Sequence, residues 1–277
     1  MTKAKIEWAD MAINPMVGCS KCSPGCDNCY AEKMAYRLSK MPATAAKYAG
    51  VVDENGWTGK ISALDLSCFD KLPKKACRVF VGSMTDLFNK DVPFDVQGKI
   101  LSTIARNQQH TFMLLTKRAD LMRKRYHTLL PNVWLGVTVC NQAEADEKIP
   151  LLLETPAAKR FVSIEPMLGP VDLNPLCSQC GGSGYYTPGY TEDGPADPEH
   201  CPCGGGSIAW MGRDGGLDWV ICGPETGPGA RPMHPDWVRS LRDQCHSAEV
   251  PFFFKGMIEN GKKTRLLDGR EWNEDPE

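Results

Sequence analysis

Short apolar runs alternate along the chain with longer segments in which apolar residues recur at helical spacing. The runs expected to form strands are Arg78–Gly82, Thr111–Thr116, Val133–Val139, Arg160–Ile164, Leu217–Cys222 and Val250–Phe254. The segments expected to form helices are Val96–Ala105, Ala119–Leu130, Gln142–Leu153 and His234–Ala248. Uninterrupted apolar strands that alternate with helices are typical of a parallel sheet covered by helices. With one more strand expected before Cys19, they predict an α/β fold, a partial or full (β/α) TIM-like barrel.

Polar residues follow the ends of most of these strands. In a (β/α) barrel the loops after the carboxyl ends of the strands meet on one rim, where the active site lies. The residues concerned are Ser83, Thr85, Asp86, Lys117, Thr138, Glu165 and Glu225. Each of them alone is explained equally well as a turn or a helix cap, but their gathering on one rim predicts a functional site.

Two stretches interrupt the alternation of strands and helices. Met41–Ala76 has no clear period and is expected to cross the surface without joining the sheet. The insert 173–216 is rich in Gly, Cys, Pro and Asp, and a structureless loop of that length is unusual within a barrel. We therefore expect residues 1–277 to form a single barrel domain, with an insert at 173–216 that has its own organising element.

Net charge, apolar runs and cysteine content limit which classes of protein this chain is expected to belong to. The net charge is −2, so no bulk attraction toward nucleic acid is expected, although a local basic patch is compatible with it. No apolar run reaches the roughly 18 residues of a membrane helix, and the N-terminus lacks the apolar region of a signal peptide. We therefore expect a cytoplasmic protein with no membrane partner. Thirteen cysteines in a reducing compartment indicate metal ligands or catalytic thiols rather than disulfides.

Four cysteines fall close together near the N-terminus: Cys19, Cys22, Cys26 and Cys29. Pro24 and Gly25 predict a turn between them, which lets the thiolates converge on one centre. The last three have the C-x3-C-x2-C spacing typical of the radical S-adenosylmethionine (SAM) superfamily, in which three thiolates hold a [4Fe–4S] cluster and SAM chelates the open iron. A structural zinc site made by all four thiolates is the alternative. The position of the cysteines, between a strand and the helix-like segment Tyr30–Ser39, favours a catalytic loop.

The run from Asn14 to Glu32 resembles the phage and prophage three-Cys-motif family of radical SAM-like proteins and, more distantly, spore photoproduct lyase. Further matching blocks are Ser83–Phe88, Leu115–Arg118, Phe161–Pro170, Asp218–Met233, Phe252–Lys255 and Leu267–Arg270. The sequence departs from the family pattern at two positions. Cys22 stands where the family has an apolar residue, and Pro224 stands where a glycine is expected.

The resemblance implies roles for particular residues. The cluster ligands would be Cys19, Cys26 and Cys29, with Cys22 as the alternative first ligand. The SAM-binding residues would be Tyr30 near the adenine, Ser83, Thr85 and Asp86 at the methionine amino group or ribose, Lys117 at the methionine carboxylate and Thr138 at the ribose. The catalytic candidates, which would face the substrate, are Glu165, Glu225, Arg231 and Lys255. A salt-bridge network on the rim explains these last four residues equally well.

A second group of cysteines lies in the insert 173–216. Its members are Cys177, Cys180, Cys201 and Cys203, the first two with glycines after them as in a zinc knuckle. We expect them to bind Zn²⁺, which would supply folding free energy to a segment with little core of its own. The short spacing of the second pair would let His200 replace one thiolate, and an auxiliary Fe–S cluster is the rival interpretation.

The leading hypothesis is a radical SAM enzyme that forms a 5′-deoxyadenosyl radical and abstracts hydrogen from a substrate. The resemblance implies a nucleobase as substrate, such as a hypermodified thymidine in phage DNA, a reductant such as flavodoxin or ferredoxin, and the cytoplasm of a host cell. Two alternatives stay open: a non-catalytic zinc protein that binds nucleic acid or a protein partner, and a radical SAM enzyme acting on a peptide or small metabolite. The sequence does not distinguish isomerase, lyase and transferase outcomes.

Overall fold

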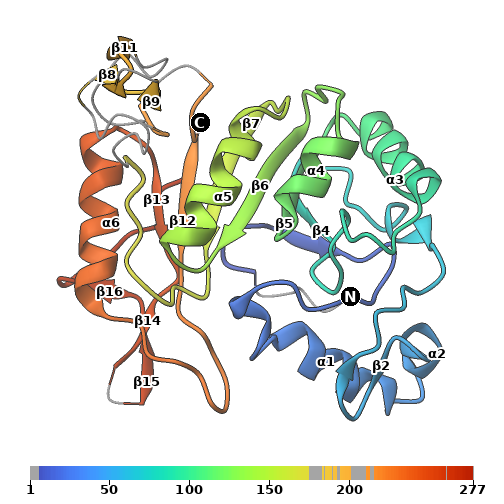
Figure 1. The fold of residues 1–277 in the computed structure, drawn as a ribbon. Helices are drawn as coiled ribbons and strands as arrows, with labels where there is room; N and C mark the ends of the chain where they lie inside the picture. Colours follow the sequence, from blue (N-terminus) through green and yellow to red (C-terminus); the bar gives the residue numbers. More distant parts are fainter. Residues whose placement is uncertain are drawn as a thin grey trace.

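Seven parallel strands form one curved sheet in the computed structural model of the chain (Figure 1). The structure describes residues 6–174, 183, 185–188, 190–191, 194–200, 210–212, 215–259 and 261–276. In spatial order the strands are β1 (Met11–Ile13), β4 (Arg78–Val81), β5 (Thr111–Thr116), β6 (Val133–Val139), β7 (Lys159–Ile164), β12 (Trp219–Cys222) and β13 (Phe252–Phe254). Every neighbouring pair is parallel, and the spatial order follows the chain order. The result is a half barrel, open between β1 and β13, which confirms the partial form of the predicted barrel.

Helices cover the outer face of this sheet, as Figure 1 shows. They are α3 (Phe94–Arg106), α4 (Ala119–Arg125), α5 (Gln142–Leu153) and α6 (Pro235–Ser247), while α1 (Tyr30–Ser39) follows β1. The main apolar core lies between these helices and the outward residues of the strands. A second, aromatic cluster fills the inner face of the half barrel and includes Trp8, Phe80, Phe161, Trp219 and Phe253. With both faces of the sheet buried, the strands read as the continuous apolar runs seen in the sequence.

The helix boundaries follow from local chemistry. The side chain of Asn141 caps α5 by accepting the amide of Glu144 at 3.0 Å. The prediction that one helix extends from residue 119 to 130 was wrong, because α4 ends at Arg125. Tyr126 takes an extended backbone and is buried, with its ring edge-on to Phe88 at 6.3 Å. Burial of this aromatic side chain overrides the helical spacing of the residues that follow.

The stretch 41–76 contributes no strand to the seven-stranded sheet, as predicted. It contains α2 (Ala45–Tyr48), β2 (Val52–Asp53), β3 (Gly56–Trp57) and the short 3-10 helix η2 (Leu66–Cys68). Tyr48, Val51 and Val52 pack on α1 in a small apolar cluster of their own. The excursion therefore supports the segment that carries the first cysteine cluster.

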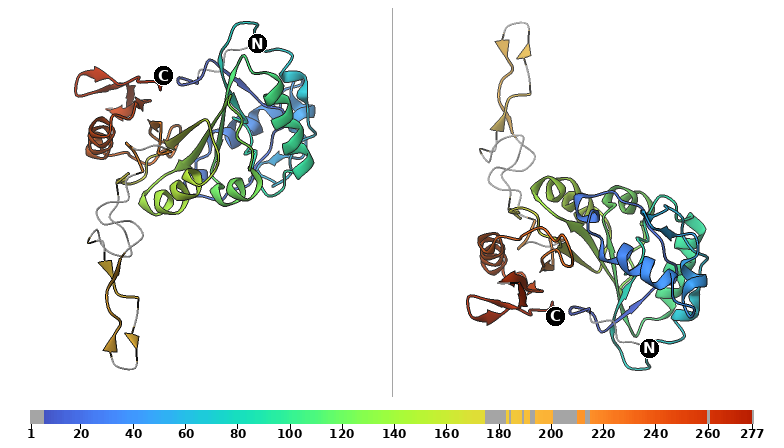
Figure 2. Two further views of the ribbon diagram at one scale, coloured as in Figure 1. Left: turned by 90° about the horizontal axis from the view of Figure 1, so that it is seen from above. Right: turned by 90° about the horizontal axis from the view of Figure 1, so that it is seen from below.

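The described residues of the insert between β7 and β12 include four two-residue strands, β8 (Tyr185–Tyr186), β9 (Tyr190–Thr191), β10 (Gly194–Pro195) and β11 (Glu199–His200). β8 pairs with β11 and β9 with β10, both antiparallel, and they stand apart from the main sheet in both views of Figure 2. The His200 ring lies 4.4 Å from the Tyr185 ring between centroids. The four predicted zinc ligands, Cys177, Cys180, Cys201 and Cys203, lie outside the described residues.

The chain ends in two hairpins, made by β14 (Met257–Glu259) with β15 (Lys262–Thr264) and by β16 (Leu266–Leu267) with β17 (Arg270–Glu271). The tail after them returns along the edge strand β13, where the amide of Phe254 donates to the carbonyl of Trp272 at 2.8 Å. This contact covers one open edge of the half barrel. Within the described parts of the chain, no helix is long and apolar enough to cross a membrane.

Candidate functional site

A pocket of about 390 Å³ opens at the carboxyl ends of the parallel strands. Each of the seven strands supplies lining residues from its end or from the loop after it. In strand order these include Cys19, Ser83, Lys117, Thr138, Glu165, Glu225 and Lys255. The pocket thus brings the predicted rim residues together, from segments more than 200 residues apart in the sequence, as the barrel geometry requires.

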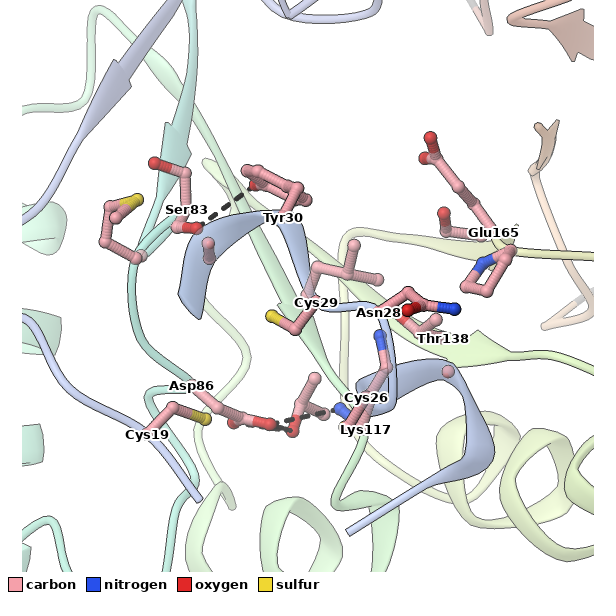
Figure 3. Close-up of a pocket in the computed structure, with 18 of the residues that line it drawn as sticks. Cys19, Cys26, Asn28, Cys29, Tyr30, Ser83, Asp86, Lys117, Thr138 and Glu165 are labelled. Carbon is pink, nitrogen blue, oxygen red and sulfur yellow. Dashed lines mark hydrogen bonds between the residues drawn. The ribbon is translucent and has the colours of Figure 1, made fainter. Parts of the chain in front are cut away.

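Three of the four N-terminal cysteines line this pocket. Cys19, Cys26 and Cys29 lie on its wall, as does Lys117, and Figure 3 labels all four residues. Cys22 is exposed and does not line the pocket. Its thiol donates a hydrogen bond to Cys26, which lowers the pKa of Cys26 and raises that of Cys22. The pocket is therefore lined by the three cysteines that the family pattern implies. The alternative ligand, Cys22, is hydrogen-bonded to one of them.

Asp86 is the centre of a buried hydrogen-bond network. One carboxylate oxygen accepts the amide of Phe88 at 3.0 Å, and both accept the hydroxyl of Thr116 at 2.7 and 2.9 Å. The second oxygen also accepts the amide of Lys117 at 3.1 Å and an Arg118 nitrogen at 3.1 Å. These donors occupy the carboxylate's acceptor sites. These contacts attach Asp86 to the Lys117 loop and leave its carboxylate few free acceptor sites for the direct SAM contact that the resemblance implies.

Lys117 and Thr138 present their polar ends to the pocket. Among the described residues, neither the Lys117 ammonium nor the Thr138 hydroxyl has a hydrogen-bond partner, and Lys117 makes no ion pair. Tyr30, by contrast, donates its hydroxyl to the carbonyl of Ser83 at 3.1 Å (Figure 3). Thr85 donates its hydroxyl to the carbonyl of Gly18 at 2.7 Å. An unpaired ammonium on the wall of a pocket is a site for an anionic group.

The catalytic candidates form two ion pairs. The ammonium of Lys255 lies 2.6 and 2.7 Å from the two carboxylate oxygens of Glu165, inside the pocket. Glu225 also lines the pocket, but Arg231 does not. The guanidinium of Arg231 donates hydrogen bonds to both carboxylate oxygens of Glu225, and these bonds lower the pKa of Glu225 to about 2. Of the four residues expected to face the substrate, Arg231 is thus the one that does not line the pocket.

A family model described as a protein of unknown function, DUF5131, matches residues 3–276. The chain belongs to the DUF5131 family. No curated protein and no solved structure matches the chain. Every residue that lines the DUF5131 pocket lies within the matched range.

Three polar residues of this DUF5131 site were missing from the prediction made from sequence. Asn14 accepts the amide of Met84 at 2.8 Å and exchanges hydrogen bonds with the hydroxyl of Ser83. Arg118 pairs with Asp86 and donates to the carbonyl of Ser20 at 2.6 Å. Asn28 donates to Glu225 at 2.9 Å. All three stand inside or beside matching motifs, so their places in the motifs were the signal that could have identified them.

The turn before Cys26 packs tightly in the DUF5131 site. Ser23 caps the 3-10 helix η1 (Pro24–Cys26), and its hydroxyl accepts the amide of Gly25 at 3.1 Å. A Cβ added to Gly25 would lie 2.4 Å from the buried sulfur of Cys140. The same Cβ would also lie 3.1 Å from the Cδ of Pro166. A glycine is therefore required by close packing at this point of the cysteine loop.

We expect Gly25→Ala to destabilise the folded chain by about 1–3 kcal/mol, the usual cost of overpacking a filled site. Urea denaturation of the metal-free protein measures this effect. Gly98→Ala is the matched control, because no atom lies within 4 Å of its added Cβ and Gly98 is in the helix α3. That control should be neutral or stabilising by about 0.5–1 kcal/mol. Equal stabilities for the two variants would contradict the packing argument.

Proposed function

We propose that this protein is a radical SAM enzyme that holds a [4Fe–4S] cluster on Cys19, Cys26 and Cys29. The observation that carries the proposal is the convergence of three thiols and the unpaired ammonium of Lys117 on one pocket at the mouth of a parallel half barrel. Cysteine thiolates are the usual ligands of Fe–S clusters. Three ligands on a four-iron cluster leave one iron for SAM, whose bound form would supply the radical chemistry.

The donor set fits such a group better than it fits a single ion. Among the residues that the structure describes, no three His, Cys, Asp or Glu side chains lie close enough to hold one metal ion. Thiolates that bind different irons of a cluster are farther apart than thiolates that share one ion, so a wider spacing suits the cluster.

The remaining pocket residues suit SAM and a substrate. Lys117 would bind the methionine carboxylate, because a carboxylate in a partly buried site needs a cation. Thr138 and Ser83 offer hydroxyl groups for the ribose and the methionine amino group. The ion pair of Glu165 and Lys255 would face the substrate. On the family resemblance, we take a nucleobase as the leading substrate class and a flavodoxin or ferredoxin as the electron donor. We take Zn²⁺ as the metal that the cysteines of the insert bind.

The proposal is tested by anaerobic reconstitution with iron and sulfide, followed by EPR of the reduced protein with and without SAM. We expect about four irons per chain and a signal that changes when SAM is added. Lys117→Met should keep the iron but weaken the response to SAM by about tenfold or more, since it removes a charged hydrogen bond. Lys124→Met, at an exposed lysine of α4, is the matched control and should respond as the native chain does.

A colourless protein that retains zinc on the N-terminal cysteines and shows no SAM response would instead establish the non-catalytic binding protein. A normal SAM response with no turnover of nucleosides or DNA, but turnover of a peptide or small metabolite, would move the substrate class to the remaining alternative.

A further inference from the structure

Both carboxylate oxygens of Glu225 accept hydrogen bonds from protein donors. The side chain of Arg231 donates to its two oxygens, from Nε at 2.9 Å and from a terminal nitrogen at 2.5 Å. The backbone amide of Arg231 and the side-chain amide of Asn28 donate to one of these oxygens at 2.8 and 2.9 Å. The residue is only 5% exposed. Glu225 therefore has little capacity left to bind a substrate group, although it lines the pocket.

The partners of Glu225 connect it to the loop that carries the cysteines, which we call the cysteine loop (residues 19–29). Arg231 reaches this loop twice, by an ion pair with Asp27 at 3.1 Å and a hydrogen bond to the carbonyl of Pro24 at 2.8 Å. Asn28 also donates to the carbonyl of Gly229 at 3.0 Å. Three residues of the cysteine loop are thus attached to the segment 225–231, about 200 residues later in the chain.

The attached residues alternate with two of the cysteines. Pro24 and Asp27 flank Cys26, and Asn28 precedes Cys29, which is the N-cap residue of α1. No main-sheet hydrogen bond reaches this part of the chain, because the loop lies beyond the end of β1. Local backbone hydrogen bonds, such as that from the Cys26 amide to the carbonyl of Ser23, shape the turn without attaching it to the sheet. Side-chain contacts therefore help to fix where Cys26 and Cys29 lie, and those to Glu225 and Arg231 come from across the pocket.

We propose that Glu225 and Arg231 are positioning residues that form, with Asn28, a latch holding Cys26 and Cys29 in place for their metal centre. The identity of that centre rests on the proposed function, but the latch itself is a property of the metal-free chain. The low pKa of Glu225 keeps its carboxylate ionised throughout the physiological pH range, so the latch does not open by protonation. This assignment replaces the substrate-facing roles expected for these two residues.

The latch is tested on the reduced, metal-free, full-length protein by the rate at which iodoacetamide alkylates each cysteine, read by mass spectrometry. Glu225→Gln and Arg231→Met should each raise the rates at Cys26 and Cys29 at least tenfold, which equals about 1.4 kcal/mol of loop opening. Cys77, at the opposite end of β4, is the internal reference and should keep its rate. Arg231→Lys should recover part of the protection, because it keeps the charge but cannot bridge all three partners.

Two further variants make the outcome decisive. The double variant Glu225→Gln/Arg231→Met should resemble either single variant, since both remove one latch. Arg239→Met, which removes an exposed arginine paired with Asp236 and Asp268 on another face, should leave all rates unchanged. After reconstitution, the latch variants should also lose iron to a chelator faster than the native chain.

Unchanged rates at Cys26 and Cys29, or an equal rise at Cys77 that reports general unfolding, would overturn the latch. These results are separable from the proposed function. A native chain that takes up no iron would remove the radical SAM assignment while leaving the alkylation result valid, and an iron-loaded native chain with unaltered alkylation in the variants would remove only the latch.

Discussion

Cys19→Ala should abolish the EPR signal of the reconstituted protein, whereas Cys22→Ala should retain most of it. Cys19 lines the pocket and Cys22 does not, although the C-x3-C-x2-C spacing favours Cys22. Burial raises the pKa of the Cys19 thiol to about 11. Polar nitrogens nevertheless surround its sulfur, with Arg118 at 3.9 Å and Asn89 at 4.0 Å, and they would stabilise the thiolate once a metal displaces the proton.

Iron content and EPR after identical reconstitution measure this difference, with circular dichroism to verify that each variant is folded. Cys77→Ala is the control, because its thiol pairs with His110 at 3.3 Å outside the pocket and should not affect iron. The reverse result, with iron lost only from Cys22→Ala, would make Cys22, Cys26 and Cys29 the triad. Loss of bound zinc from both variants would support the four-cysteine zinc site.

Most of the strands could be predicted from the sequence because they are buried on both faces. Such a strand must be apolar throughout, and a run like Val133–Val139 has no other easy explanation. The rim residues followed from the same reasoning, since parallel strands end on one side. The end of α4 could not be predicted, because the burial of Tyr126 depends on Phe88, which belongs to a different loop.

The hydrogen-bond and ion-pair partners of the rim residues could not be predicted from the sequence. Their positions after strands indicated Asp86 and Glu225 as residues of the site, and the family resemblance added Arg231. Neither argument showed that protein donors fill the two carboxylates. Asp86 pairs with Arg118 and Glu225 with Asn28, partners 32 and 197 positions away, and both pairings depend on side-chain directions set by the whole sheet. A carboxylate that binds a ligand and one that supports a loop therefore look identical in the sequence, and only their partners distinguish them.

Asp86→Ala should destabilise the native chain by about 3–5 kcal/mol, because it leaves the Arg118 guanidinium buried without its counter-ion. The two side chains are 9% and 8% exposed and lie 3.1 Å apart. The change also removes the acceptor of Thr116 and of the Lys117 amide. Urea denaturation of the metal-free protein gives the free energy of unfolding. Asp95→Ala, which breaks the exposed ion pair with Lys99, is the control and should change it by less than about 1 kcal/mol.

The double variant Asp86→Ala/Arg118→Met distinguishes a role of Asp86 in positioning the Lys117 loop from a role in binding SAM. Without the buried cation, it should recover much of the stability lost in Asp86→Ala, since the penalty comes largely from the unpaired charge. If Asp86 only positions the Lys117 loop, the SAM response of the double variant should recover in part with the stability. If Asp86 contacts SAM itself, stability would return while the response stayed low, and the role that the family resemblance implies would be restored.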